Sequence, residues 1–231
     1  MIALNRMEEE QCIRMGVNKD RIRIVPNGIN LSEFEDLPQR GTFRKKSGIS
    51  LDSPMVLYLG RIHRIKGLDL LVDAFALTVG KLKDARLVLA GPDDGLLSVL
   101  ASQASALGIE DRVIMTGPLY KDAKIEAYVD ADAYVLPSRY EVFGITVLEA
   151  AICGTPVIVT RKCGIADFVE RIGYVVDPEP GDLAHAIVEA IGERMNGRLV
   201  RERIALVEHE FDLNAVTRKL EEVYENCIRN F

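Results

Sequence analysis

The chain has 231 residues, 48% of them hydrophobic and 28% charged, and a formal net charge of −6 at pH 7. These values are ordinary for a soluble globular protein with one large domain, or with one domain and an additional arm. The acidic balance argues against a nucleic-acid partner, because nucleic-acid grooves carry an excess of lysine and arginine. No apolar run approaches the roughly 20 residues that a membrane-spanning helix needs.

The cysteines form neither a CxxC pair nor a metal-ligand spacing with the three histidines. They are Cys12, Cys153, Cys163 and Cys227. We therefore expect reduced and mostly buried thiols, as in a cytosolic protein. The first residues also lack the charged and then apolar pattern of a secretory signal. These features predict a cytoplasmic protein, which is compatible with work on substrates held at the periphery of a membrane.

The N-terminal part predicts a helix over residues 4–15 and a strand over residues 21–25, followed by a Pro-Asn-Gly turn signal. We assign residues 1–30 to a lead-in segment and residues 31–231 to the main domain. Within the main domain, the stretch 40–47 is polar and basic, and we expect it to form a surface loop.

From residue 56 onward, short β-rich runs alternate with amphipathic segments, the pattern of a parallel sheet wrapped by helices. Strands are predicted over residues 56–60, 86–90, 113–116, 133–136, 156–160 and 173–176. Helices are predicted over residues 67–79, 96–107, 122–131, 145–153, 182–195 and 212–231, with Asp212 as the cap of the last one. The fold class is therefore α/β, a Rossmann-like doubly wound parallel sheet of about six strands with right-handed crossovers.

Basic residues follow the first strand of this sheet. Gly60 and Arg61 come directly after it, and Lys66 directly precedes the next helix. Ligands of open parallel sheets bind beyond the carboxyl ends of the strands. Arginine offers a planar fork to phosphate oxygens, lysine a mobile charge, and the helix N-terminus attracts anions. A solvated basic turn explains this segment equally well, and the usual dinucleotide and P-loop glycine motifs are missing from it.

The segment after strand 133–136 combines a glycine with the start of a helix. Gly144 lets the backbone come close to a ligand. The N–H groups of Gly144, Ile145 and Thr146 are then free to face an incoming phosphate, because the first N–H groups of a helix have no partner within it. This segment predicts a phosphate-binding helix start.

Two glutamates, Glu141 and Glu149, flank that glycine. Glu141 lies in the loop, whereas Glu149 falls inside an apolar helix, where a carboxylate needs partners. A vicinal diol such as a ribose would supply two hydrogen-bond donors. The alternative is a purely structural ion pair of Glu149 with Arg61 or Lys66.

Two other turns and the histidines carry less chemistry. The Gly-Pro-Asp-Asp-Gly run at residues 91–95 is interpreted as an acidic turn, although it lies at the same edge. The Cys-Gly-Thr-Pro run at residues 153–156 is interpreted as the end of a helix and the start of a strand. His63 has no acidic partner at a suitable spacing, so we predict no histidine base.

Taken jointly, these segments resemble the donor half of group 1 (family 4) GT-B retaining glycosyltransferases. The resemblance rests on Gly60-Arg61 with Lys66-Gly67, and on residues 141–156, whose glutamates are separated by seven residues as in the family signature. Residues 24–30, 91–93 and 116–119 are also similar. The resemblance implies the C-terminal half of a GT-B fold, so that residues 31–231 would be a nucleotide-sugar-binding domain with a C-terminal helix.

The resemblance also implies roles for individual residues. Arg61, Lys66 and Glu141 would be the catalytic residues, the first two by neutralising the diphosphate of the leaving group. Glu149 would accept hydrogen bonds from the ribose, and Leu119 would approach the base through its main chain. The whole implied donor-binding set is Gly60, Arg61, Lys66, Leu119, Glu141, Val142, Phe143, Gly144, Ile145, Thr146 and Glu149. The donor would be a UDP- or GDP-linked sugar, with no cofactor and no protein-bound metal.

Residues 162–167 depart from the family pattern, which often has two glycines and a Pro-Glu pair there. A further departure is length, since residues 1–20 are similar to the last helix of an acceptor-binding domain that is missing. The resemblance thus implies transfer to an acceptor sugar, lipid or small molecule held by an N-terminal domain outside this chain, and weak or no activity of the isolated chain. The alternatives are a non-catalytic sugar-nucleotide-binding module and a sugar-nucleotide epimerase on the same scaffold.

Overall fold

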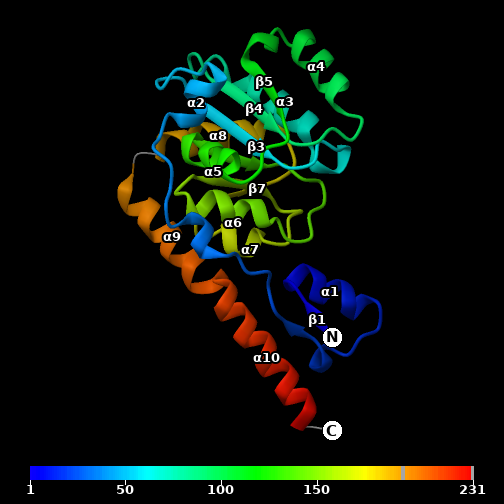
Figure 1. Ribbon diagram of the computed structural model, residues 1–231. Coiled ribbons are helices and arrows are strands. Elements are labelled where there is room, and N and C mark those ends of the chain that lie inside the picture. Colours follow the sequence, from blue (N-terminus) through cyan, green and yellow to red (C-terminus); the bar gives the residue numbers. More distant parts are fainter. Residues whose placement is uncertain (194–195, 230–231) are drawn as a thin grey trace.

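The computed structural model describes residues 1–193 and 196–229. It contains a six-stranded parallel sheet in the order β5-β4-β3-β6-β7-β8 and a separate two-stranded sheet near the N-terminus (Figure 1). The six strands are β3 Met55–Leu59, β4 Arg86–Ala90, β5 Val113–Gly117, β6 Ala133–Leu136, β7 Val157–Thr160 and β8 Tyr174–Val176. Every neighbouring pair in this sheet is parallel. The predicted fold class and all six predicted strands are confirmed.

The helices connect and cover these strands. They are α1 Arg6–Arg14, α2 Thr42–Ser47, α3 Leu68–Thr78, α4 Leu97–Ala106, α5 Asp122–Asp130, α6 Ile145–Ile152, α7 Ala166–Val169, α8 Pro180–Glu193, α9 Gly197–Phe211 and α10 Leu213–Arg229. On one face of the sheet α3 packs against α4 and α8, and on the other α5 packs against α2 and α6. The predicted ends of two helices at Met195 and Phe231 lie outside the described residues. No helix in the described ranges has the length and apolar character needed to cross a membrane.

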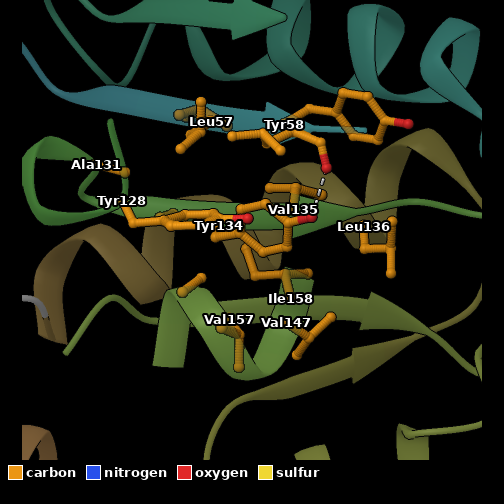
Figure 2. Packing of buried hydrophobic residues seen from close by; sticks show 14 of the residues in the cluster. Leu57, Tyr58, Tyr128, Ala131, Tyr134, Val135, Leu136, Val147, Val157 and Ile158 are labelled. Carbon is orange, nitrogen blue, oxygen red and sulfur yellow. Dashed lines mark hydrogen bonds between the residues drawn. The ribbon is translucent and has the colours of Figure 1, made fainter. Parts of the chain in front are cut away.

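The core lies around the central strands because both of their faces are covered by helices. All residues of β3 and β6 are buried, which explains why these strands read as continuous apolar runs. Figure 2 shows the packing of Leu57, Tyr134, Val135, Val147 and Ile158 in this region. Side chains of this size, fully removed from water, contribute about 1.5–3 kcal/mol each to folding.

The prediction of a surface loop over residues 40–47 is wrong. Residues 42–47 form α2, and the Arg44 side chain within it is fully buried. Its guanidinium group donates to the carboxylate of Asp132 at 2.7 Å and to the carbonyl oxygens of Asp130 and Ser53. A stretch that looks basic and solvated in the sequence is therefore anchored in the core, and two of the three partners, Asp130 and Asp132, are more than 80 residues away.

The lead-in segment forms a small unit with its own apolar cluster. Strand β1 (Ile2–Ala3) pairs in parallel with β2 (Arg23–Ile24), and Ala3 packs with Cys12 and Ile22. The amphipathic helix α10 follows α9 and runs past this unit (Figure 1). The predicted cap of α10 is confirmed, since the side chain of Asp212 accepts a hydrogen bond from the Asn214 N–H at 3.3 Å.

Candidate functional site

The candidate residues gather where the direction of the sheet reverses. From β3 the chain moves outward through β4 to β5, and it then crosses back to β6 on the other side of β3. The loops that follow β3 and β6 diverge at this switch point, which is where open parallel sheets bind their ligands. The basic segment follows β3, and the segment with both glutamates follows β6.

The loop after β3 is fixed by hydrogen bonds to a strand residue and within the loop itself. The Tyr58 hydroxyl donates to the carbonyl of Arg61 at 2.8 Å. His63 caps the following turn, since its Nδ1 atom accepts from the N–H of Ile65 at 3.2 Å. This contact gives His63 a structural role, and the absence of a histidine base stays a prediction. Gly67 then begins α3 with a φ of +67°, and a Cβ atom there would overlap the carbonyl oxygen of Pro137 in the loop after β6. The two loops are therefore in direct contact.

Arg139 connects the loop after β6 to the loop after β3 and to α3. The backbone N–H of Arg139 donates to the carbonyl of Ile65 at 2.8 Å, and its guanidinium group makes two hydrogen bonds of 2.7 Å to the carboxylate of Asp69 in α3. The hydrogen bond from Arg139 is the main reason why the pKa of Asp69 is lowered. Arg139 was not among the predicted site residues, because its role depends on the contact between the two loops.

The structure brings two of the three predicted catalytic residues together. Lys66, from the loop after β3, forms an ion pair with Glu141, from the loop after β6, and both side chains are mostly buried, at 18% and 17% exposure. Arg61 lies apart from this pair, with its side chain 58% exposed and 3.4 Å from the carboxylate of Asp94. The acidic turn at residues 91–95 thus supplies the partner of Arg61 and belongs to the same edge of the sheet.

The start of α6 has the form that the sequence predicts. Gly144 precedes the helix with a φ of +88°, a conformation that favours glycine. The amide groups of Ile145 and Thr146 belong to the first turn, which has no partners within the helix. The ring of Phe143 is buried and packs edge-on against Phe211, so Phe143 offers only its backbone to a ligand.

Glu149 does not pair with Arg61 or Lys66, so the alternative interpretation of a structural pair with either of them is wrong. Its partners come from α5. The Nζ atom of Lys124 lies 2.6 Å from one carboxylate oxygen, and the hydroxyl of Tyr128 donates to the other at 2.8 Å. Lys124 and Tyr128 are four residues apart and share a helix face, a spacing from which a common partner could have been predicted.

The remaining predicted residues lie around this centre. Gly60 is in close contact with the loop after β4, because a Cβ atom on Gly91 would overlap its carbonyl oxygen. Leu119 follows β5 and is half-buried against the core. Val142 is half-buried, and its carbonyl accepts a hydrogen bond from the side chain of Asn5 in the lead-in segment. The predicted set therefore occupies the ends of β3, β5 and β6.

The Tyr134 hydroxyl is buried beneath the candidate residues. Burial raises the pKa of Tyr134 well above its usual range, and the negative charges of Glu149 and Glu141 add to this effect. Within residues 1–193 and 196–229, no three His, Cys, Asp or Glu side chains are grouped as a metal site would require. The expectation of a reaction without a protein-bound metal stays a prediction.

The comparisons with known proteins agree with this arrangement. An α/β domain with its charged residues at the switch point of a parallel sheet is typical of enzymes that bind nucleotides. Residues 39–205 match the family described as glycosyl transferases group 1. The chain belongs to this family, and the predicted resemblance to group 1 glycosyltransferases is confirmed.

Two curated relatives illustrate the match. The chain is 33% identical over 188 residues to a D-inositol 3-phosphate glycosyltransferase of Xylanimonas cellulosilytica, covering 77% of this chain and 44% of the relative. It is 31% identical over 197 residues to a mannosylfructose-phosphate synthase of Agrobacterium fabrum, covering 80% of this chain and 43% of the relative. The chain thus spans less than half the length of these two proteins.

Solved structures confirm the fold. Anabaena HepE in complex with UDP and glucose superposes with a TM-score of 0.87 at 22% identity, over 97% of this chain and 62% of HepE. A sucrose-phosphate synthase of Thermosynechococcus elongatus superposes with a TM-score of 0.79 at 28% identity, over all of this chain and 58% of the synthase. These neighbours are glycosyltransferases of the GT-B fold.

Proposed function

We propose that this chain binds a UDP- or GDP-linked sugar at the switch point and takes part in the transfer of its glycosyl group with retention of anomeric configuration. The acceptor, a sugar, lipid or small molecule, would be held by an N-terminal domain outside this chain. In this proposal residues 31–231 are the donor-binding domain, and residues 1–30 are the lead-in to it. The isolated chain would bind donor but show little or no transfer.

One observation carries the proposal. The Lys66–Glu141 pair, the start of α6 and Glu149 all lie at the carboxyl ends of β3 and β6. They offer a cation and helix N–H groups for a diphosphate and a carboxylate for the hydroxyl groups of a ribose. These are the complementary groups that a sugar nucleotide presents along its length. The UDP found in complex with HepE supports the assignment of such a ligand to this fold.

The proposed chemistry uses charge stabilisation. Lys66 and Arg61, together with the amide groups at the start of α6, would stabilise the negative charge that develops on the departing nucleoside diphosphate. Glu141 keeps Lys66 in position and would contact the transferred sugar. We expect no cofactor beyond the donor itself.

The proposal is tested by a thermal-shift screen of the whole chain against UDP-, GDP- and ADP-sugars. A ligand that binds only the folded state at 100 times its Kd stabilises the protein by about 2.7 kcal/mol, so one donor series should raise the Tm clearly. The Glu149→Gln variant is the matched control, and its shift should be smaller. Absence of any shift for all three series would contradict the proposal.

Transfer requires a second experiment. We would join the chain to the N-terminal domain of a relative and follow sugar transfer together with the anomeric configuration of the product. Binding without transfer in an otherwise folded protein would favour the non-catalytic binding module, and epimerisation of the sugar nucleotide would favour the epimerase. We propose a cytoplasmic protein, working at the membrane periphery where the acceptor is a lipid.

A further inference from the structure

Three fully buried tyrosines lie in the core next to the candidate site. They are Tyr58 in β3, Tyr128 in α5 and Tyr134 in β6, and the rings of the last two pack edge-on with centroids 5.6 Å apart (Figure 2). A phenylalanine would fill such core positions equally well, and a buried hydroxyl without a partner is costly. We therefore expect each of the three hydroxyl groups to make a specific hydrogen bond.

Each of these hydroxyl groups has a partner at the site. Tyr58 donates to the carbonyl of Arg61, and the hydroxyl of Tyr134 lies 2.7 Å from that of Thr146 at the start of α6. Tyr128 differs from both, because it donates to the very group through which Glu149 would bind a ligand, its carboxylate. Arg61 accepts through its main-chain carbonyl, and Thr146 would bind a ligand through its main-chain N–H. Tyr128 is thus the tyrosine whose hydroxyl can influence recognition most directly.

The hydrogen-bonding capacity of Glu149 shows what this contact leaves open. A carboxylate has about four lone-pair positions, two on each oxygen. Lys124 uses one position on Oε1, and Tyr128 uses one on Oε2. One position remains on each oxygen, which matches the two donors of a vicinal diol. The two protein partners also fix the plane of the carboxylate, so that both remaining positions keep a fixed direction.

We propose that Tyr128 and Lys124 are positioning residues that present Glu149 to the 2′- and 3′-hydroxyl groups of the donor's ribose. This inference rests on the proposed function of the site. Burial keeps the Tyr128 hydroxyl protonated and therefore a permanent donor, because it raises the pKa of this group well above its usual range. Without the hydroxyl group, Oε2 loses its fixed partner and the carboxylate is free to turn toward Lys124.

The test measures the ribose-dependent part of the affinity. Calorimetry on the full chain would compare UDP with 2′,3′-dideoxy-UDP, or the corresponding guanine pair where the chain prefers GDP. In Tyr128→Phe the affinity for UDP should fall by about tenfold, the scale of one hydrogen bond to a charged group, while the affinity for the dideoxy analogue stays unchanged. In a Glu149→Gln background the same substitution should have no further effect, because Tyr128 acts through Glu149.

Two variants separate positioning from general damage. Lys124→Gln removes the other partner of Glu149 from a partly exposed helix face, and it should reduce the preference for UDP over the dideoxy analogue as Tyr128→Phe does. Tyr134→Phe removes a hydroxyl from the neighbouring ring without touching Glu149, so it should keep this preference at the wild-type value.

Equal losses for both ligands in Tyr128→Phe, or a loss that persists in the Glu149→Gln background, would overturn the inference and leave the proposed function intact. A wild-type chain that binds neither UDP nor GDP would overturn the proposed function, and this inference with it.

Discussion

At the scale of single residues, three cations of the candidate site are already paired with carboxylates. Lys66 pairs with Glu141, Lys124 with Glu149, and Arg61 with Asp94. A diphosphate must compete with these carboxylates for the cations. The competition is easiest at Arg61, because exposed pairs contribute only about 0–1 kcal/mol. Arg61 is therefore the cation that is most readily available to an incoming ligand.

This availability predicts how Arg61→Ala alters binding. Its affinity for UDP should fall by about tenfold, because a charge-assisted hydrogen bond to phosphate is lost, whereas its affinity for uridine should stay near the wild-type value. Calorimetry with both ligands checks this. Arg198→Ala, which removes an exposed arginine from a comparable pair with Glu202, is the control and should change neither affinity. Equal losses for UDP and uridine would exclude a phosphate contact of Arg61.

At the scale of elements, all six strands of the main sheet were predicted from local pattern, whereas no helix was predicted at the position of α9. The central strands β3 and β6 are continuous apolar runs because both of their faces are covered. Glycine directly follows β3 and β4, at Gly60 and Gly91. The start of α6 at Gly144 was predictable from local pattern as well. Lys66 and Glu141 were each predicted as site residues, but their pairing was not, because it requires the contact of two loops 75 residues apart.

The misassigned element shows where such reasoning fails. Four of the eight residues in 40–47 are Arg or Lys, which is typical of a solvated surface. Burial of Arg44 depends on Asp130 and Asp132, which lie at the end of α5 and just before β6. The sequence around residue 44 contains no sign of these distant partners. The partners of Glu149 on α5 were missed for the same reason, since they depend on how two helices pack.

The buried guanidinium group makes a strong prediction for stability. Arg44→Met should lower the free energy of unfolding by about 3–5 kcal/mol, because it leaves buried carboxylate and carbonyl oxygens without their donor. Urea denaturation measures this change. Arg14→Met is the matched control, since it removes an exposed guanidinium group from its exposed pair with Glu10 and should cost less than about 1 kcal/mol. Similar losses in the two variants would contradict the interpretation of Arg44 as an anchor.

The ion pair between α3 and the loop after β6 predicts a pH dependence. Arg139 lowers the pKa of Asp69, so this carboxylate contributes stability above its unfolded pKa of about 3.9 and loses it as the pH falls through the lower folded value. Asp69→Asn should therefore be less stable than the wild type at pH 7, with a smaller difference at pH 3. Urea denaturation of both proteins at the two pH values tests this. A difference that is the same at both would show that the charge on Asp69 is not the cause.

At the scale of the whole molecule, the lead-in segment is connected to the candidate site. Asn5 caps α1 with its side-chain oxygen and donates from its side-chain nitrogen to the carbonyl of Val142, next to Glu141. Glu141 in turn forms an isolated bridge with Cys163, in the turn after β7. Three segments that are far apart in the sequence thus meet beside the Lys66–Glu141 pair. We therefore expect a change in the packing of the lead-in to alter the position of Glu141, a candidate catalytic residue.

Gly164 lies where these segments meet, within the stretch that departs from the family pattern. A Cβ atom at this position would overlap the carbonyl oxygen of Val142 and the side-chain amide of Asn5. Gly164→Ala must therefore push the loop after β6 and the lead-in apart. The free energy of unfolding should fall by about 1–3 kcal/mol, the usual cost of an overpacked site. The affinity for UDP should fall as well, because Val142 adjoins Glu141.

Chemical denaturation and calorimetry measure the two effects. Gly181→Ala is the matched control, since a Cβ atom there meets no described atom within 4 Å, and both quantities should stay near their wild-type values. A Gly164→Ala protein with wild-type stability and UDP affinity would contradict this prediction. It would show that Val142 and Asn5 can move to accommodate the methyl group without loss of stability or binding. Loss of stability alone would mean that the lead-in and the site are packed together but not coupled, whereas a joint loss is expected if the backbone around Val142 sets the position of Glu141.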